Sequence, residues 1–136
     1  MNRGIHDITV PGGPIEITDS GGGPLTIDVE EKTLLFATGT AAVSGDNTII
    51  ASPGVNQEIV IVAIQIQNES VSETLAIIKF GSTAKWRFLA KEKGSGFTIP
   101  IQNGYAWHVG VNTAVVLNLN GANQFGYNII YYTKAV

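Results

Sequence analysis

The side chains that could carry acid–base, nucleophilic or metal chemistry are few in this chain and far apart in sequence. His6 and His108 are its two histidines, and cysteine is absent. Metal sites and histidine-based triads need several such groups close together, so we expect no metal, no disulfide and no thiolate chemistry. Glu58, Glu69 and Glu73 flank strand-like segments, and we interpret them as solvated strand ends. We therefore expect no catalytic activity and no cofactor.

One aromatic segment could bind a ligand without catalysis. Trp107-His108, with Tyr105 just before it, could form a stacking platform for a sugar, such as a host-surface glycan. Trp107 could equally pack in a core beside an exposed histidine. We favour packing, and we keep Tyr105 and Trp107 as candidate glycan contacts.

A second aromatic segment combines rings with bases. Trp86-Arg87-Phe88 lies between Lys85 and Lys91, an interleaving that also occurs in proteins that bind single-stranded nucleic acid. Because the aromatic residues alternate with Arg87 and Leu89, a strand with one inward face explains the segment better. We expect no nucleic-acid partner.

The distribution of charge separates the first 31 residues from the rest. Charged residues make up 14% of the 136, against about 25% in an average domain. Residues 1–31 carry six acids and one base, a net charge of −5, whereas residues 32–136 carry five acids and seven bases, a net charge of +2. An acidic N-terminal segment suits a basic protein surface better than a nucleic acid. The longest apolar run, Ile59–Ile64, is far shorter than the ~20 residues of a membrane span, and the basic start has no apolar run after it, so we expect a soluble protein with no membrane partner.

Strand signals recur along the chain, while helix signals are almost absent. Runs rich in β-branched residues stand between Gly, Pro, Asn and Ser, at the ~8–12-residue spacing typical of a sandwich or barrel. We predict one all-β domain over 32–136, an antiparallel β-sandwich that is jelly-roll-like, with hairpins at Asn103-Gly104 and Asn120-Gly121. The predicted strands of this domain are Lys32–Thr38, Asn47–Ser52, Glu58–Gln67, Glu73–Phe80, Trp86–Ala90, Gly96–Ile101, Ala106–Val111, Ala114–Asn118 and Tyr127–Thr133.

Two of these strands, Glu58–Gln67 and Tyr127–Thr133, are apolar on both faces. Strict alternation in 59–66 places Ile59, Ile61 and Ala63 on one face and the remaining apolar residues on the other. A two-layer sandwich covers only one face of each sheet, so we expect the second face to be buried by another subunit or by the N-terminal segment. The candidates for this subunit interface are Val60, Val62, Ile64, Ile66, Ile130 and Tyr132.

The first 31 residues contain one short phrase twice. GGPIEIT (12–18) is followed by GGPLTID (22–28), and each Gly-Gly-Pro is a hinge that leads into a strand too short to be stable alone. We predict an extended arm, with weak strands at Asp7–Val10, Ile15–Thr18 and Leu25–Val29, that adds to the edge of another sheet. Its partner is either the surface of another protein or a neighbouring subunit. The candidate docking residues are Ile8, Val10, Ile15, Ile17, Leu25, Ile27 and Val29.

The segment from Asp46 to Tyr132 resembles a group of small phage virion β-sandwich proteins. The likeness is carried by NTIIASPGVNQEIVIVAIQIQNES, by the turn Phe80-Gly81-Ser82-Thr83, by FTIPIQNGYAWHV, and by the closing Leu117-Asn118-Leu119-Asn120 through Tyr127. It covers about two-thirds of the chain and leaves the arm out, and Thr83 stands where glycine-rich turns are commoner.

This group includes head decoration (cement) proteins and modules of head or tail fibres, usually trimers of jelly-roll-like sandwiches. The resemblance implies a structural virion protein, a homotrimer that is made in the host cytoplasm and binds the major capsid protein on the capsid exterior. The alternative is a carbohydrate- or receptor-binding module of a phage fibre.

Overall fold

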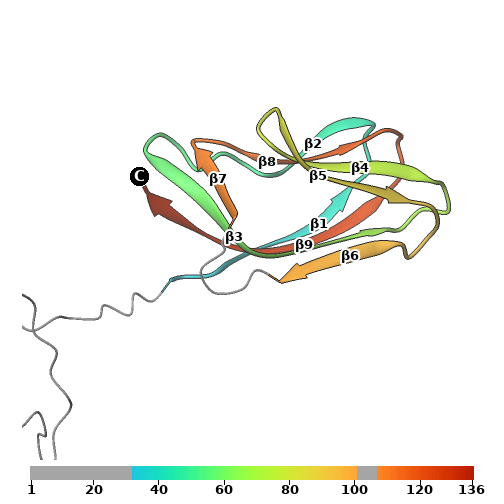
Figure 1. The fold of residues 1–136 in the computed structure, drawn as a ribbon, viewed down its shortest axis with the longest axis horizontal. Coiled ribbons are helices and arrows are strands. Elements are labelled where there is room, and N and C mark those ends of the chain that lie inside the picture. The colour runs from blue at the N-terminus through green and yellow to red at the C-terminus, as the bar shows by residue number, and fades with distance from the viewer. Residues whose placement is uncertain (1–31, 101–106) are drawn as a thin grey trace, which may run out of the picture. The chain divides into compact units, whose positions relative to one another are not determined.

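The computed structural model describes residues 32–100 and 107–136, which form nine β-strands without a helix (Figure 1). This confirms the all-β prediction, and each predicted strand of 32–136 has an observed counterpart. The three weaker strands predicted in the arm lie outside the described residues. The strands are β1 (Leu35–Ala41), β2 (Gly45–Ile50), β3 (Gln57–Asn68), β4 (Thr74–Phe80), β5 (Thr83–Ala90), β6 (Gly96–Pro100), β7 (Trp107–Val111), β8 (Val115–Leu119) and β9 (Phe125–Ala135).

The strands form two antiparallel sheets that pack face to face (Figure 1). One sheet has the order β1-β9-β3-β6, with β7 also paired to β3, and the other has the order β2-β8-β4-β5. Pro100 at the end of β6 lies opposite Ala63, and Trp107 at the start of β7 lies opposite Ile61. β6 and β7 therefore follow one another along β3 as a single interrupted edge strand.

The pairing pattern is that of a jelly roll. β4 pairs with β5, β3 with β6 and β7, β2 with β8, and β1 with β9, so the chain forms one long hairpin whose strand pairs alternate between the two sheets. The tip is the two-residue turn Gly81-Ser82, and Gly81 has a φ of 59°, the positive value that a type II′ turn requires at its first central position. Two four-stranded layers, with β6 and β7 counted as one strand, match the jelly roll and confirm the predicted sandwich.

The core lies between the inner faces of the two sheets. Aliphatic residues from both sheets fill its centre, and a cluster of aromatic rings closes the side where β5 faces β6 and β7. The ring centroids of Trp86 and Phe97 are 5.8 Å apart, those of Phe88 and Phe97 are 5.2 Å apart, and those of Trp86 and Trp107 are 6.0 Å apart. The inward face predicted for Trp86 and Phe88 is thus confirmed.

The prediction of strict alternation along β3 is wrong, because a β-bulge interrupts the strand. The register against β9 shifts between Ile61 and Ala63, so Val62 is the extra residue and the side chains after it change face. Ile64 and Ile66 therefore join Ile59 and Ile61 in the core, and all four are 1% exposed or less.

The predicted hairpins are also wrong in topology. Asn120-Gly121 joins β8 to β9, which belong to different sheets, so this turn crosses the sandwich. Asn103-Gly104 lies outside the described residues, and the strands on either side of it, β6 and β7, do not pair with each other. The one hairpin between consecutive strands of a single sheet in the described chain is β4–β5.

Candidate assembly surface

The outer face of the five-stranded sheet is apolar at one end. Across the strands, Phe36 of β1 lies opposite Ile130 of β9, and Ile130 lies opposite Ala63 of β3. Residues directly opposite one another share a face, and this row faces away from the core because Ala37 and Ile129, one position along, pack in it. Phe36 is 71% exposed, the most exposed aromatic side chain in the described chain.

The start of β1 extends this apolar end. Leu34 and Leu35 are also exposed, so three consecutive large apolar side chains face solvent. A run of this kind is uncommon on a folded surface unless it has a function. Tyr132, on the same face, is partly exposed, and the Lys32 Nζ atom lies over its ring, 5.4 Å from the centroid. We call Leu34, Phe36, Val62, Ala63, Ile130 and Tyr132 the apolar face. Leu35, opposite Tyr131, lies on the inner side of β1.

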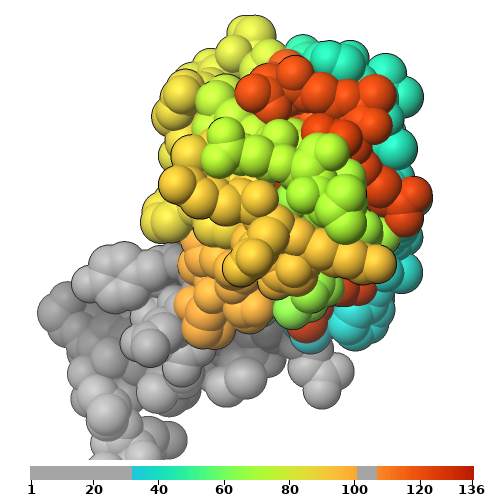
Figure 2. All heavy atoms as spheres, turned by 90° about the vertical axis from the view of Figure 1, so that its right-hand side faces the viewer, coloured from blue at the N-terminus to red at the C-terminus, as the bar shows by residue number. Residues whose placement is uncertain are grey.

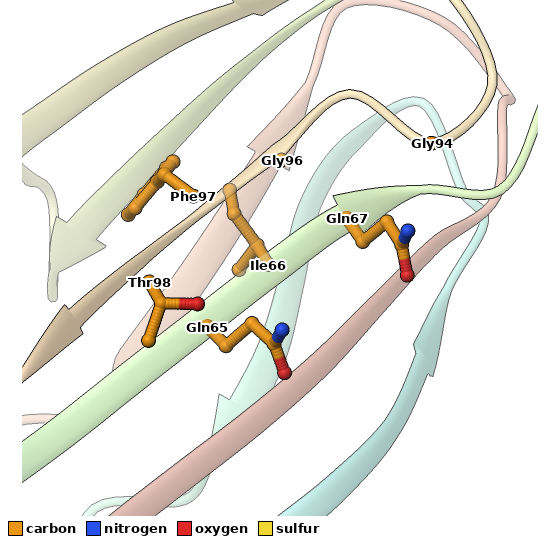
Figure 3. Close-up of a pocket in the computed structure, with 7 residues that line it drawn as sticks. All are labelled: Gln65, Ile66, Gln67, Gly94, Gly96, Phe97 and Thr98. Carbon is orange, nitrogen blue, oxygen red and sulfur yellow. The ribbon is translucent and has the colours of Figure 1, made fainter.

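The other end of the same sheet face is polar. Thr38 Oγ1 donates to Asn128 Oδ1 over 2.7 Å, and Asn128 Nδ2 donates to Gln65 Oε1 over 3.2 Å, so the three side chains form a row across β1, β9 and β3. Gln65 and Gln67 extend from one side of β3 and Ile66 from the other (Figure 3). With Thr98 they line part of a surface depression with a volume of about 310 Å³.

A glycine allows the close strand approach beside this depression. A Cβ on Gly96 would collide with the carbonyl oxygen of Ile66 and lie 3.0 Å from Cα of Gln67. The position pairs with Gln67 at the start of β6, so glycine is required there by the approach of two backbones.

The predicted subunit interface is only partly available on this surface. Val62, Ile130 and Tyr132 are partly exposed and belong to the apolar face. Val60 is fully buried. Ile64 and Ile66 lie in the core, because the bulge at Val62 turns them inward. Val60 shares the outer face with Tyr132 and His108 but is fully covered there, and Ile64 and Ile66 are interior positions. None of the three presents area to a neighbouring subunit, so they are removed from the predicted interface.

Of the two candidate glycan contacts, Tyr105 and Trp107, the structure describes only Trp107. Trp107 faces inward from β7 and packs edge-to-face against Phe80, with 6.2 Å between the ring centroids, so the packing interpretation is correct for this ring. His108 faces outward and is half-exposed, with Nδ1 2.6 Å from Oε1 of Glu58. Tyr105 lies outside the described residues, as do all seven candidate docking residues of the arm.

Charged side chains gather on β5 and the segment that follows it. Lys85, Arg87, Lys91 and Lys93 stand here against Glu92, a net charge of +3 (4 − 1), whereas the rest of 32–136 has three bases and four acids, a net charge of −1. In residues 32–100 and 107–136 the ion pairs are Lys79–Asp46 and His108–Glu58, so no carboxylate of the described chain neutralises this group. Figure 2 shows β5 and the segment after it, in yellow and gold, at the surface of the molecule.

On the outer face of the four-stranded sheet, Asp46 is held in its charged form. Asn118 Nδ2 donates to Asp46 Oδ1 over 2.5 Å, and Lys79 Nζ lies 3.0 Å from both carboxylate oxygens. The hydrogen bond from Asn118, followed by that from Lys79, lowers the pKa of Asp46 below its ordinary value of 3.8. A lowered carboxyl pKa contributes stability that is present above the unfolded-state value and is lost as the pH falls through the folded-state value.

We therefore expect Asp46→Asn to change the acid limb of the stability profile. Between neutral pH and about 4 the wild type should keep this small contribution, and below 3.8 it should lose it, so the urea midpoints of wild type and variant should converge as the pH falls. Urea titrations at pH 7 and pH 3 measure this difference. A constant gap between the two proteins over that range would contradict the assignment.

The described residues contain no cluster of the kind that holds a metal ion. No group of three or more His, Cys, Asp or Glu residues that could hold a metal occurs in 32–100 or 107–136. No helix in this part of the chain could span a membrane. What the described surface offers is a sheet face, a polar depression and a basic edge strand, all of which suit binding between macromolecules.

Comparison with known proteins gives structural likenesses alone. No protein-family model matches the chain, and no curated protein matches it in sequence. A chain from the cryo-EM structure of the extra small virus of the giant freshwater prawn Macrobrachium rosenbergii, solved as a VLP, aligns with a TM-score of 0.46 and 8% identity over 97% of this chain and 96% of that one. The crystal structure of PirA aligns with a TM-score of 0.31 and 16% identity over 79% of this chain and 98% of that one. The jelly roll is established by the strand pairings themselves, independently of these two structures.

Proposed function

We propose that this protein is a structural component of a virion that acts by assembly, as a homotrimer packed through the apolar face. The observation that carries the proposal is the exposure of Leu34 and Phe36 beside Ile130 and Tyr132. A contiguous apolar area of this kind is a mark of protein–protein contact. Three sandwiches that meet at this face around a threefold axis would bury it.

We assign the trimer to the outside of a phage head, as a capsid decoration protein whose partner is the major capsid protein. The sequence resemblance of residues 46–132 to phage virion sandwiches supports this, and the jelly roll is a fold that capsid proteins use. The first part of the arm, with Ile8, Val10, Ile15 and Ile17, would add to a strand of the capsid protein. Each contact across a capsomer boundary stabilises the shell by about 25 cal/mol per Å² of buried apolar area, before the entropic costs of association.

Titration of the purified protein onto expanded, undecorated capsids of the parent phage tests this function. We expect saturable binding at micromolar concentration or below, and loss of that binding when residues 1–24 are deleted. The deletion variant should keep the solution mass of the wild type, which separates capsid docking from trimer formation. Failure of the full chain to bind at micromolar concentration would refute the decoration role.

A carbohydrate-binding module of a phage fibre is the second candidate. The polar depression of Gln65, Gln67 and Thr98 favours it, although Trp107 is committed to packing. Amide and hydroxyl groups of this kind can hydrogen-bond a sugar, whereas the exposed aromatic rings of this sheet face, Phe36 and Tyr132, lie at its other, apolar end. A glycan-array signal that disappears in Gln65→Ala, together with absent capsid binding, would favour this candidate over decoration.

A further inference from the structure

Two edge strands of the sandwich differ sharply in what surrounds them. β1 ends one sheet and β5 ends the other, and within residues 32–100 and 107–136 neither has a strand partner on its outer side. An exposed edge of this kind is a template for an added strand. Within residues 35–41 β1 has no basic residue, whereas β5 and the segment after it carry Lys85, Arg87, Lys91 and Lys93.

The two faces of β5 are also distinct. Trp86 and Phe88 lie on the core side, opposite Ile78 and Ala76, and Trp86 is still 42% exposed. Arg87 lies on the outer side, opposite Ile77, and is exposed. A strand added here would meet half-covered aromatic rings on one face and positive charge on the other.

Residues 25–31 of the arm have the complementary pattern. Leu25, Ile27 and Val29 alternate with Thr26, Asp28 and Glu30, and Glu31 follows, so one face of an extended segment is aliphatic and the other is acidic. The segment carries a charge of −3, against the +3 of β5 and its following segment (residues 83–93). Charge complementarity of this kind fixes partner and register at a protein interface.

Chain length favours a second copy as the source of this segment. Val29 and Leu35 are six residues apart, which spans about 20 Å at full extension. The route around the sandwich from β1 to β5 crosses three strand spacings and one sheet spacing, together roughly 24 Å. Residues 29–31 therefore fall short of the β5 edge of their own sandwich, which favours the β5 edge of a second copy as the partner of this segment.

We propose that residues 25–31 of one subunit add as a strand to the β5 edge of a neighbouring subunit. Leu25, Ile27 and Val29 extend the core side beside Trp86 and Phe88, and Asp28 and Glu30 face Arg87 and its neighbours. This inference rests on the self-association that the proposed function includes, and it assigns the second arm repeat to a neighbouring subunit rather than to the capsid. Capsid titration measures docking on the shell, whereas the experiment below measures contact between copies of the chain. The capsid proposal and this inference can therefore fail independently of each other.

Engineered disulfides between full-length chains test the proposal, since the chain has no native cysteine. An Asp28→Cys protein is mixed with a size-tagged Arg87→Cys protein under mild oxidation, and mixed dimers are resolved by mass. We expect the mixed dimer to form at least about tenfold faster than with Val43→Cys, an exposed control position in the β1–β2 connection, because strand pairing raises the local thiol concentration. Glu30→Cys should behave like Asp28→Cys, and Ile27→Cys, on the opposite face, should not link to Arg87→Cys.

Charge exchange supplies a second measurement that does not depend on thiol geometry. Arg87→Glu should weaken self-association about fivefold at low salt, and Asp28→Lys in the same chain should restore it. Equal linking to Arg87→Cys and Val43→Cys, or no mixed dimer at all, would overturn the proposal. A doubly substituted Asp28→Cys, Arg87→Cys chain that closes only on itself as a monomer would do the same, because it would place the segment on its own subunit.

Discussion

Phe36→Thr is expected to weaken self-association of the protein by about a hundredfold while leaving the sandwich folded. The ring is 71% exposed in the isolated subunit, so on the order of 140 Å² of aromatic surface is available for burial in an interface. At about 25 cal/mol per Å² this area is worth roughly 3 kcal/mol, which corresponds to about two powers of ten in affinity. Sedimentation velocity over a concentration series measures the shift.

The matched control is Val71→Thr, an exposed apolar residue in the connection between β3 and β4. It makes the same change from apolar to hydroxyl-bearing side chain away from the apolar face. We expect its association to equal that of the wild type. Threonine suits a strand, so the thermal midpoint of Phe36→Thr, measured where both proteins are monomeric, should stay close to that of the wild type. Unchanged association in Phe36→Thr would show that the apolar face is not the interface.

Ile64→Ala should destabilise the sandwich by about 2–5 kcal/mol, the usual cost of emptying a fully buried aliphatic position. Ile64 is 1% exposed and faces the core beside Ile129, with which it pairs. Val62→Ala, two residues earlier, should cost less than about 1 kcal/mol, since this side chain is partly exposed at the bulge and surface changes are mild. Urea unfolding of both variants measures the difference.

The comparison is best made in the Phe36→Thr background. Association stabilises folded subunits by mass action, and a shared monomeric background removes this contribution from both variants. Strict alternation would put Val62 and Ile64 on one face and predict similar costs. Equal free energies of unfolding for the two variants would therefore contradict the bulge.

The number and type of the strands could be predicted because they depend on local sequence. β-branched runs between Gly, Asn and Ser predict the strands of 32–136, and the alternation around Arg87 predicts the inward face that Trp86 and Phe88 occupy. Their pairing could not be predicted, since it depends on contacts between residues far apart in the chain. Asn120-Gly121 has the composition of a hairpin turn but connects β8 and β9 in different sheets.

The same limit explains the errors at the interface. An alternation argument assumes a regular strand, and one extra residue at Val62 reverses the face of everything after it. Ile64 and Ile66 were for that reason assigned outward. Phe36 is absent from the predicted interface because the predicted strand Lys32–Thr38 does not by itself show which of its faces is inward. The alternation of Leu34 and Phe36 with Leu35 and Ala37 alone could not show which side meets the core, which is fixed by pairing with Ile129 and Ile130.

The central claim is that this jelly roll acts by assembly through the apolar face. The molar mass of the full-length protein in solution, measured by light scattering at several concentrations, tests it most directly. The account predicts a trimer of about 43 kDa, three times the 14.4 kDa of one chain, that dissociates at a higher concentration in Phe36→Thr than in the wild type. A mass of 14.4 kDa at every concentration would contradict the account.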